Sequence, residues 1–182
     1  MGRTGGIMMK GAFTFFMLLA CSSALFAQET KNPVSSAVRE ILTRQQKNLV
    51  AAAEEMPADK YDYKPTPQQM SFAHLTIHVT ETNNLLCAKI SDTPEPKAPE
   101  PKEADGKDKL VAAVKASFDF CTAALAKVDD SKLGDSFELF GGHTGTRAMA
   151  MFILTNALAD HYSVAAMYLR LNGMLPPTAQ KK

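Results

Sequence analysis

The sequence predicts an all-α protein built from four helices. Apolar residues recur at steps of three and four in four separate stretches, and segments rich in proline or glycine separate these stretches. No alternating polar and apolar run is long enough to compete as a strand. The 182 residues, 46% hydrophobic and 21% charged, exclude a disordered or collagen-like chain and are typical of one globular domain.

Residues 1–27 have the three parts of a secretory signal peptide: a basic start, an apolar run and a small residue at the exit. The uncharged run, residues 11–27, is shorter than the about 20 apolar residues of a membrane span. We predict cleavage after Ala27, and the alternative is lipidation at Cys21, which follows a lipoprotein-like sequence. Either way we expect an exported protein, periplasmic or extracellular, without a stable membrane span in its mature form.

The expected mature domain, residues 28–182 with a core at about 33–173, is nearly neutral. The chain has 20 basic and 19 acidic residues, and removal of two basic residues with the signal leaves 18 and 19, a net charge of −1. Nucleic-acid-binding domains carry a marked positive excess. We therefore expect no nucleic-acid partner, while pairing with a second copy and the identity of any small-molecule ligand stay open.

The first two helices have recognisable starts. Asn32 is an N-cap residue followed by proline at the first helical position, and Pro57 ends this helix. After a proline-rich connector, Ser71 caps a second helix that runs to about residue 90. We predict that the inward face of this second helix consists of Leu75, His78, Thr82, Leu85 and Lys89, with Phe72 and Leu86 beside it.

The segment 91–106 alternates four prolines with charged residues, which predicts an extended, solvated linker. Its sixteen residues can span up to ~50 Å, further than the ~28 Å length of the second helix. The linker can therefore run back along the bundle and leave the second and third helices parallel. We place the third helix at about 107–128, an irregular connector at 129–145 with a glycine turn, and the fourth helix at about 146–172.

Two cysteines remain after removal of the signal, Cys87 and Cys121. In an oxidising compartment they would form a disulfide between two helices. Two buried free thiols fit the sequence equally well.

The candidates for chemistry are histidines. His78 and His161 fall on inward faces of different helices, where neutral imidazoles can bind a divalent transition metal or serve as hydrogen-bonded core residues. His74 and His78 have the i, i+4 spacing of zinc motifs but lack the glutamate of the HExxH pattern. His143 would lie ~27 Å from His161 along a helix, too far to share a ligand.

Two segments resemble the DinB-like family. They are MPADKYDYKPTPQQMSF at 56–72, followed by His78, and DHYSVAAMYLRLNG at 160–173, followed by two prolines. The resemblance implies a four-helix bundle with up-down-down-up topology, in agreement with the linker length. It also implies a divalent metal, zinc or nickel, held by one histidine at the position of His78 and a pair of histidines four residues apart that ends at His161.

The sequence departs from that pattern at Ala157, which stands where the first histidine of the pair is expected. Zinc sites normally use at least three protein ligands, so two imidazoles would bind metal weakly. Glu81, one turn beyond His78, is a candidate replacement. Three readings remain: an exported binding module with an altered metal site, a structural or interaction module of the cell envelope, and, as the resemblance to the DinB-like family implies, a metal-dependent thiol transferase or isomerase.

Overall fold

The computed structural model describes residues 1–2 and 31–180, and every helix and strand in these residues belongs to the compact unit Asn32–Lys182. The predicted signal peptide, with Cys21 and the cleavage position after Ala27, lies outside the described residues except for its first two. Within the described part of the chain, no helix is both long and apolar enough to cross a membrane.

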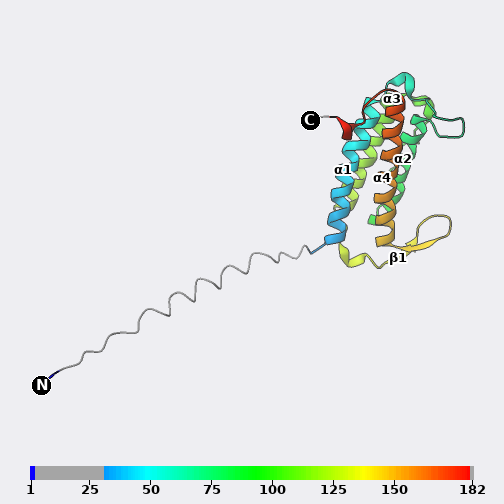
Figure 1. The fold of residues 1–182 in the computed structure, drawn as a ribbon. Helices are drawn as coiled ribbons and strands as arrows, with labels where there is room; N and C mark the ends of the chain where they lie inside the picture. The colour runs from blue at the N-terminus through cyan, green and yellow to red at the C-terminus, as the bar shows by residue number, and fades with distance from the viewer. Residues whose placement is uncertain (3–30, 181–182) are drawn as a thin grey trace. The chain divides into compact units, whose positions relative to one another are not determined.

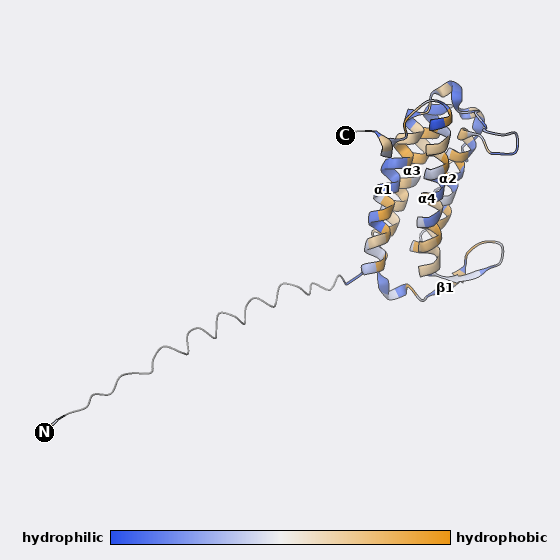
Figure 2. Ribbon diagram, in the orientation of Figure 1, coloured by the Kyte–Doolittle hydropathy of each residue, from blue (hydrophilic) through white to orange (hydrophobic). Residues whose placement is uncertain are grey.

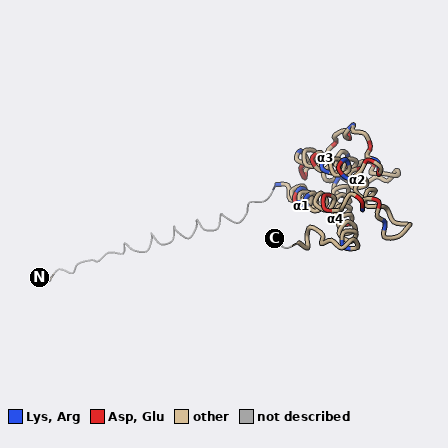
Figure 3. Tube along the Cα trace, turned by 90° about the horizontal axis from the view of Figure 1, so that it is seen from above, with Lys and Arg blue, Asp and Glu red and all other residues tan. Residues whose placement is uncertain are grey.

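The four expected helices are present: α1 Pro33–Glu55, α2 Phe72–Ser91, α3 Lys107–Leu125 and α4 Arg147–Leu171 (Figure 1). Their bounds lie close to the expected ones, but α3 ends at Leu125, three residues before the expected end at Val128. Seen along the bundle, α2 lies diagonally opposite α1, and α3 and α4 each pack against both of them (Figure 3). Basic and acidic residues are interspersed around the bundle in the same view.

Contacts between helix ends fix the direction of each helix. Lys107, at the start of α3, donates a hydrogen bond to the carbonyl of Glu54 near the end of α1. At the other end, Arg39 near the start of α1 donates to the carbonyls of Leu125 and Val128, at 3.2 and 2.9 Å. α3 is therefore antiparallel to α1.

The start of α4 lies beside the end of α2, because Arg147 donates to the carbonyl of Ile90. At the opposite end, Tyr168 of α4 donates to the carbonyl of Met70, just before α2, at 2.9 Å. The topology is thus up-down-down-up, as expected, and the linker between α2 and α3 returns along the bundle.

The start of α1 is capped from a distance. Asn32 is the residue before the helix and Pro33 its first residue, as predicted, but the Asn32 side chain makes no hydrogen bond to the helix. Instead, the Asp130 carboxylate accepts from the backbone N–H groups of Val34 and Ser35, at 2.9 and 2.8 Å. Asn32 accepts from the N–H of Asp130, so the two side chains tie the connector after α3 to the first helix.

The connector between α3 and α4, expected to be irregular, contains a short hairpin. Strands β1 Ser136–Glu138 and β2 Thr144–Thr146 pair antiparallel, with Phe137 opposite Gly145. The predicted glycine turn joins them, with both glycines at positive φ. Three-residue strands are too short to give an alternating pattern, so this addition could not be read from periodicity.

The core runs between the helices, while the segments that join them at the end opposite the hairpin are largely hydrophilic (Figure 2). The predicted inward face of α2 is wrong for most of its members. Leu75 is buried, but His78, Thr82, Leu85 and Lys89 are only half-buried. The buried face of α2 is set by its contacts with both α3 and α4, and its members are Phe72, Ala73, Leu75, Thr76, Ile77, Val79, Thr80, Asn83, Leu86, Cys87, Ala88 and Ile90.

Candidate functional site

His78 of α2 and His161 of α4 meet in the structure, as the DinB resemblance implies. Their ring centroids are 4.9 Å apart and the rings meet edge to face, at 76°. His78 is half-buried, whereas His161 is 8% exposed and its Nδ1 has no hydrogen-bond partner among the described residues. The pair therefore joins two helices through one nearly solvent-free imidazole and one that reaches the surface.

Burial lowers the pKa of His161 below its usual value of 6.5, and the nearby His78 lowers it further. The negative charge of Asp160 acts in the opposite direction but is outweighed. His161 is thus neutral at neutral pH, the state in which an imidazole nitrogen can accept a hydrogen bond or bind a metal.

The third position of the expected metal site offers no ligand. Ala157 lies one turn before His161 on α4, and its methyl group has no donor atom. Glu81 is exposed and lines a cavity between α2 and α3. Residues 31–180 contain no group of three or more histidine, cysteine, aspartate or glutamate side chains able to hold a metal ion. The donors present therefore do not fit a centre with three protein ligands.

His161 belongs to a polar layer inside the bundle. Gln45, Asn83, Ser117 and His161 come one from each helix and are all buried. Each lies 10 or 11 residues, roughly 15 Å, from the same end of the bundle. Asn83 donates to the Ser117 hydroxyl at 3.0 Å, while Gln45 Oε1 and Asn83 Oδ1, like His161 Nδ1, lack partners among the described residues.

The other two histidines lie elsewhere. His74 is exposed, and its Nδ1 is 3.2 Å from the Glu103 carboxylate, which also accepts from the Ser71 hydroxyl. His143 is exposed in the hairpin loop. Neither joins the His78–His161 pair, as expected for His143.

A cavity of about 520 Å³ lies between α2, α3 and the returning linker, and His78 lines it as well as contacting His161. Its α2 wall consists of His78, Thr80, Glu81, Thr82, Asn84 and Leu85. Small residues of α3 and prolines of the linker form the other walls. The complete lining is His78, Thr80, Glu81, Thr82, Asn84, Leu85, Glu95, Pro96, Ala98, Pro99, Glu100, Pro101, Ala113, Ala116 and Ser117.

The two cysteines form a disulfide between α2 and α3, with Cα atoms 5.2 Å apart. Of the two alternatives left open by the sequence, the structure contains the bonded one. Both cysteines are fully buried. The bond thus fixes the helix pair that forms two walls of the cavity.

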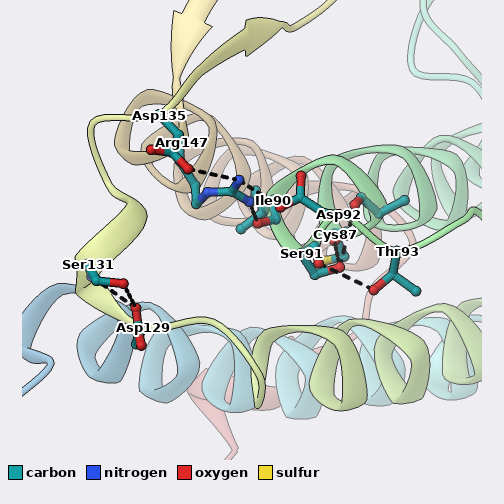
Figure 4. A network of polar contacts seen from close by, with 10 residues as sticks. Cys87, Ile90, Ser91, Asp92, Thr93, Asp129, Ser131, Asp135 and Arg147 are labelled. Atoms are coloured by element: carbon teal, nitrogen blue, oxygen red, sulfur yellow. Dashed lines mark hydrogen bonds and ion pairs between the residues drawn. The ribbon is translucent and has the colours of Figure 1, made fainter.

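Sequence reasoning missed Arg147, the first residue of α4, whose side chain is only 5% exposed. Its guanidinium bonds to the carbonyl of Ile90 and pairs with Asp92 at 2.9 Å and with Asp135 at 3.8 Å (Figure 4). It also lies 5.7 Å from the centre of the Phe137 ring. Arginine is mostly exposed in folded proteins, so we expect an arginine at a predicted helix start to lie at the surface. Nothing in the sequence indicated this network.

A family model described as the DinB superfamily matches residues 41–165, more than half of the chain. The chain belongs to the DinB superfamily. The match covers both histidines of the pair and the cavity walls on α2 and α3. No curated protein sequence matches the chain.

Two solved structures show the same fold. A DinB-like protein from Bacillus subtilis is 19% identical, with a TM-score of 0.65, and the similarity covers 80% of this chain and 99% of that one. A conserved protein from Enterococcus faecalis is 17% identical, with a TM-score of 0.62, covering 75% of this chain and 95% of that one. At these identities the likeness establishes the fold alone.

The residues that carried the DinB resemblance have structural contacts. Tyr61 packs edge to face on Phe72 at 5.2 Å and donates to the carbonyl of Ala53 at 2.6 Å. Tyr63 packs edge to face on Tyr168 at 6.0 Å. Burial raises the pKa of Tyr61 and of Tyr168, in keeping with neutral hydroxyls that donate. These aromatic rings anchor the connector between α1 and α2 on the bundle.

Proposed function

We propose that this DinB-superfamily protein is an exported binding module that does not depend on the three-histidine metal centre expected of its family. Its role would be to hold a small molecule outside the cytoplasm rather than to transfer a thiol group with a bound metal. The observation that carries the proposal is the paired His78 and His161 with Ala157 in the third position. Two imidazoles without a third protein ligand leave a transition metal weakly held.

Export is supported by two independent features. The sequence of residues 1–27 has the parts of a signal peptide, and the disulfide between Cys87 and Cys121 is of a kind that persists in oxidising compartments. A thiol-rich cytoplasm would keep such a pair reduced. N-terminal sequencing of the processed protein would separate a start at Gln28 from a lipidated Cys21, and a chain that retains Met1 and stays in the cytoplasm would contradict export.

The experiment on the metal compares the wild-type protein with the variant Ala157→His. We expect zinc and nickel titrations by calorimetry to detect no stoichiometric binding to the wild type, because one ligand is missing. Ala157→His adds an imidazole one turn before His161, so we expect about one equivalent of metal to bind. Ala157→Asn, which adds polar bulk without an imidazole, and the double variant Ala157→His/His161→Ala are the matched controls and should bind none.

A second candidate keeps a divalent metal at His78 and His161, with Glu81 or water completing the site. The observation that favours it is the buried Nδ1 of His161, which has no partner among the described residues. One equivalent of zinc or nickel on the wild type, lost in both His78→Ala and His161→Ala, would establish this candidate and overturn the metal-independent proposal. A metal-dependent transferase or isomerase would then again be a candidate for the activity.

A further inference from the structure

The cavity between α2, the linker and α3 has an acidic lining. Three carboxylates line it, Glu81, Glu95 and Glu100, and no lysine or arginine does. Among the described residues, none of the three takes part in a hydrogen bond or ion pair, unlike Glu103 at the end of the same linker. The cavity therefore carries negative charge that no lysine or arginine of its lining neutralises.

The remaining lining is suited to aliphatic groups and to hydrogen-bond donors. Pro96, Pro99, Pro101 and Leu85 give apolar surface between the carboxylates. The side-chain oxygen of Asn84 is buried without a partner among the described residues. A buried acceptor without a donor is unfavourable unless a donor is supplied from elsewhere, and a ligand N–H can supply it.

The cavity is also held in shape. The disulfide joins α2 to α3, and the linker is fixed at its far end, where Glu103 contacts Ser71 and His74. Its volume of about 520 Å³ lies within the usual range for small-molecule sites. Prolines stiffen the covering segment, which limits the entropy lost when a ligand binds.

We propose that this cavity binds a linear aliphatic polyamine. Its ammonium groups would pair with Glu81, Glu95 and Glu100, its methylene chain would lie on the prolines and Leu85, and one N–H would reach Asn84. This site adds a ligand class to the binding role proposed above. It shares His78 and Glu81 with the second metal candidate, but neither His161 nor Ala157 lines it. The two proposals can therefore fail separately: metal on the wild type overturns only the first, and the polyamine test below overturns only the second.

The test is calorimetric titration of the purified protein with spermidine, at low and at physiological salt. We expect one binding site whose affinity falls as salt rises, because ammonium–carboxylate attraction at a partly open site is screened. The neutral 1,8-octanediol, which offers a similar chain without charge, should bind at least tenfold more weakly. Equal binding of the diol would overturn the proposal.

Two kinds of variant locate the site. Glu81→Gln/Glu95→Gln/Glu100→Gln should lower spermidine affinity about tenfold, the sum of three exposed ion pairs. The matched control Glu40→Gln/Asp62→Asn/Glu138→Gln changes net charge equally at exposed positions outside the cavity and should bind as the wild type does. Unchanged affinity in the first triple variant, or an equal loss in the control, would overturn the site.

The second kind of variant fills the cavity without changing its charge. Ala116 is exposed on the α3 wall, so Ala116→Trp should leave the thermal unfolding midpoint close to that of the wild type while lowering spermidine affinity at least tenfold. Retained affinity in a folded Ala116→Trp protein would contradict binding in this cavity. Circular dichroism on every variant separates lost binding from lost folding.

Discussion

The two sides of α2 face different surroundings. Toward α4 it presents His78 to His161, in a contact that buries His161 and lacks a third ligand among the described residues. Toward α3 and the linker it presents a polar face, which also includes the half-buried His78, to a cavity lined by three carboxylates. The side that the family resemblance marks as functional is thus short of donor atoms, while the other side has unused charge and space.

The two sides are also held together by different means. α2 is joined to α3 by the covalent Cys87–Cys121 bond, and to α4 at its end by the Arg147 network (Figure 4). A disulfide acts mainly on the unfolded chain, whereas an ion network depends on burial and geometry in the folded one. One helix can therefore be fixed on two sides by interactions that respond to different conditions. The contact of α2 with α3 responds to redox state, and its contact with α4 responds to ionisation.

The largest expected effect comes from the covalent side. Cys87→Ala/Cys121→Ala removes a bond that spans 34 residues of sequence, including the whole linker. Loop-closure entropy for that length gives a loss of about 3–4 kcal/mol in the free energy of unfolding. Urea denaturation would measure it, with reduced wild-type protein as the matched sample. A loss below about 1 kcal/mol in both samples would contradict a structural role for the disulfide.

The next effect comes from the α4 side. Arg147→Met keeps an apolar stem but leaves the Ile90 carbonyl without its charged donor and removes the pairs with Asp92 and Asp135. We expect a loss of about 2 kcal/mol in the free energy of unfolding, because hydrogen bonds to charged groups are worth about 1.5–3 kcal/mol and both aspartates are exposed.

The control for Arg147 is Lys89→Met in the same region, since Lys89 donates only one exposed hydrogen bond, to the Glu138 carbonyl. Surface changes of this kind shift stability by roughly 0.5 kcal/mol or less. If the two variants lose equal stability, burial does not strengthen the Arg147 interactions. The network between α2 and α4 would then contribute no more to stability than a surface contact.

The fold was predictable because it depends on repeated, local signals. Helix starts such as Pro33 and Ser71 and the stop at Pro57 are encoded within a few residues, and linker length limited the topology. The buried face of α2 was not predictable in the same way. A helix that packs against two neighbours has a wide apolar face, and the stripe through His78, Thr82 and Leu85 turned out to border the cavity.

The candidate sites also differ in how far the sequence predicts them. The contact between His78 and His161 agrees with the DinB resemblance, although His78 is half-buried and only His161 faces inward. The distant cap from Asp130, the burial of Arg147 and the carboxylates of the linker above α2 all depend on segments that meet only after folding. No spacing in the sequence relates them, so pattern reasoning could not find them.

The smallest expected effect is a dependence of the free energy of unfolding on pH. It comes from His161, in the contact between α2 and α4. Because the folded-state pKa of His161 lies below 6.5, the unfolded chain takes up a proton on acidification before the folded one does. Stability from this residue is fully present above about pH 7 and decreases as the pH falls through 6.5 toward the lowered folded-state value. Urea denaturation at pH 7.5, 6.5 and 5.5 should therefore give a falling free energy of unfolding, and His161→Leu should reduce that slope.

Other groups can be separated from this effect. The carboxylates with lowered pKa values, Glu103, Asp105, Asp129 and Asp130, titrate below their ordinary values of 4.5 and 3.8, outside the window. His143→Ala, in the exposed hairpin loop, is the matched histidine control and should keep the wild-type slope. His78→Leu removes the neighbouring imidazole that helps to lower the pKa of His161, so it should make the slope shallower without abolishing it. A slope that is unchanged in His161→Leu would mean that the contact between α2 and α4 is open to water, and the contrast between the two sides of α2 would then rest on charge alone.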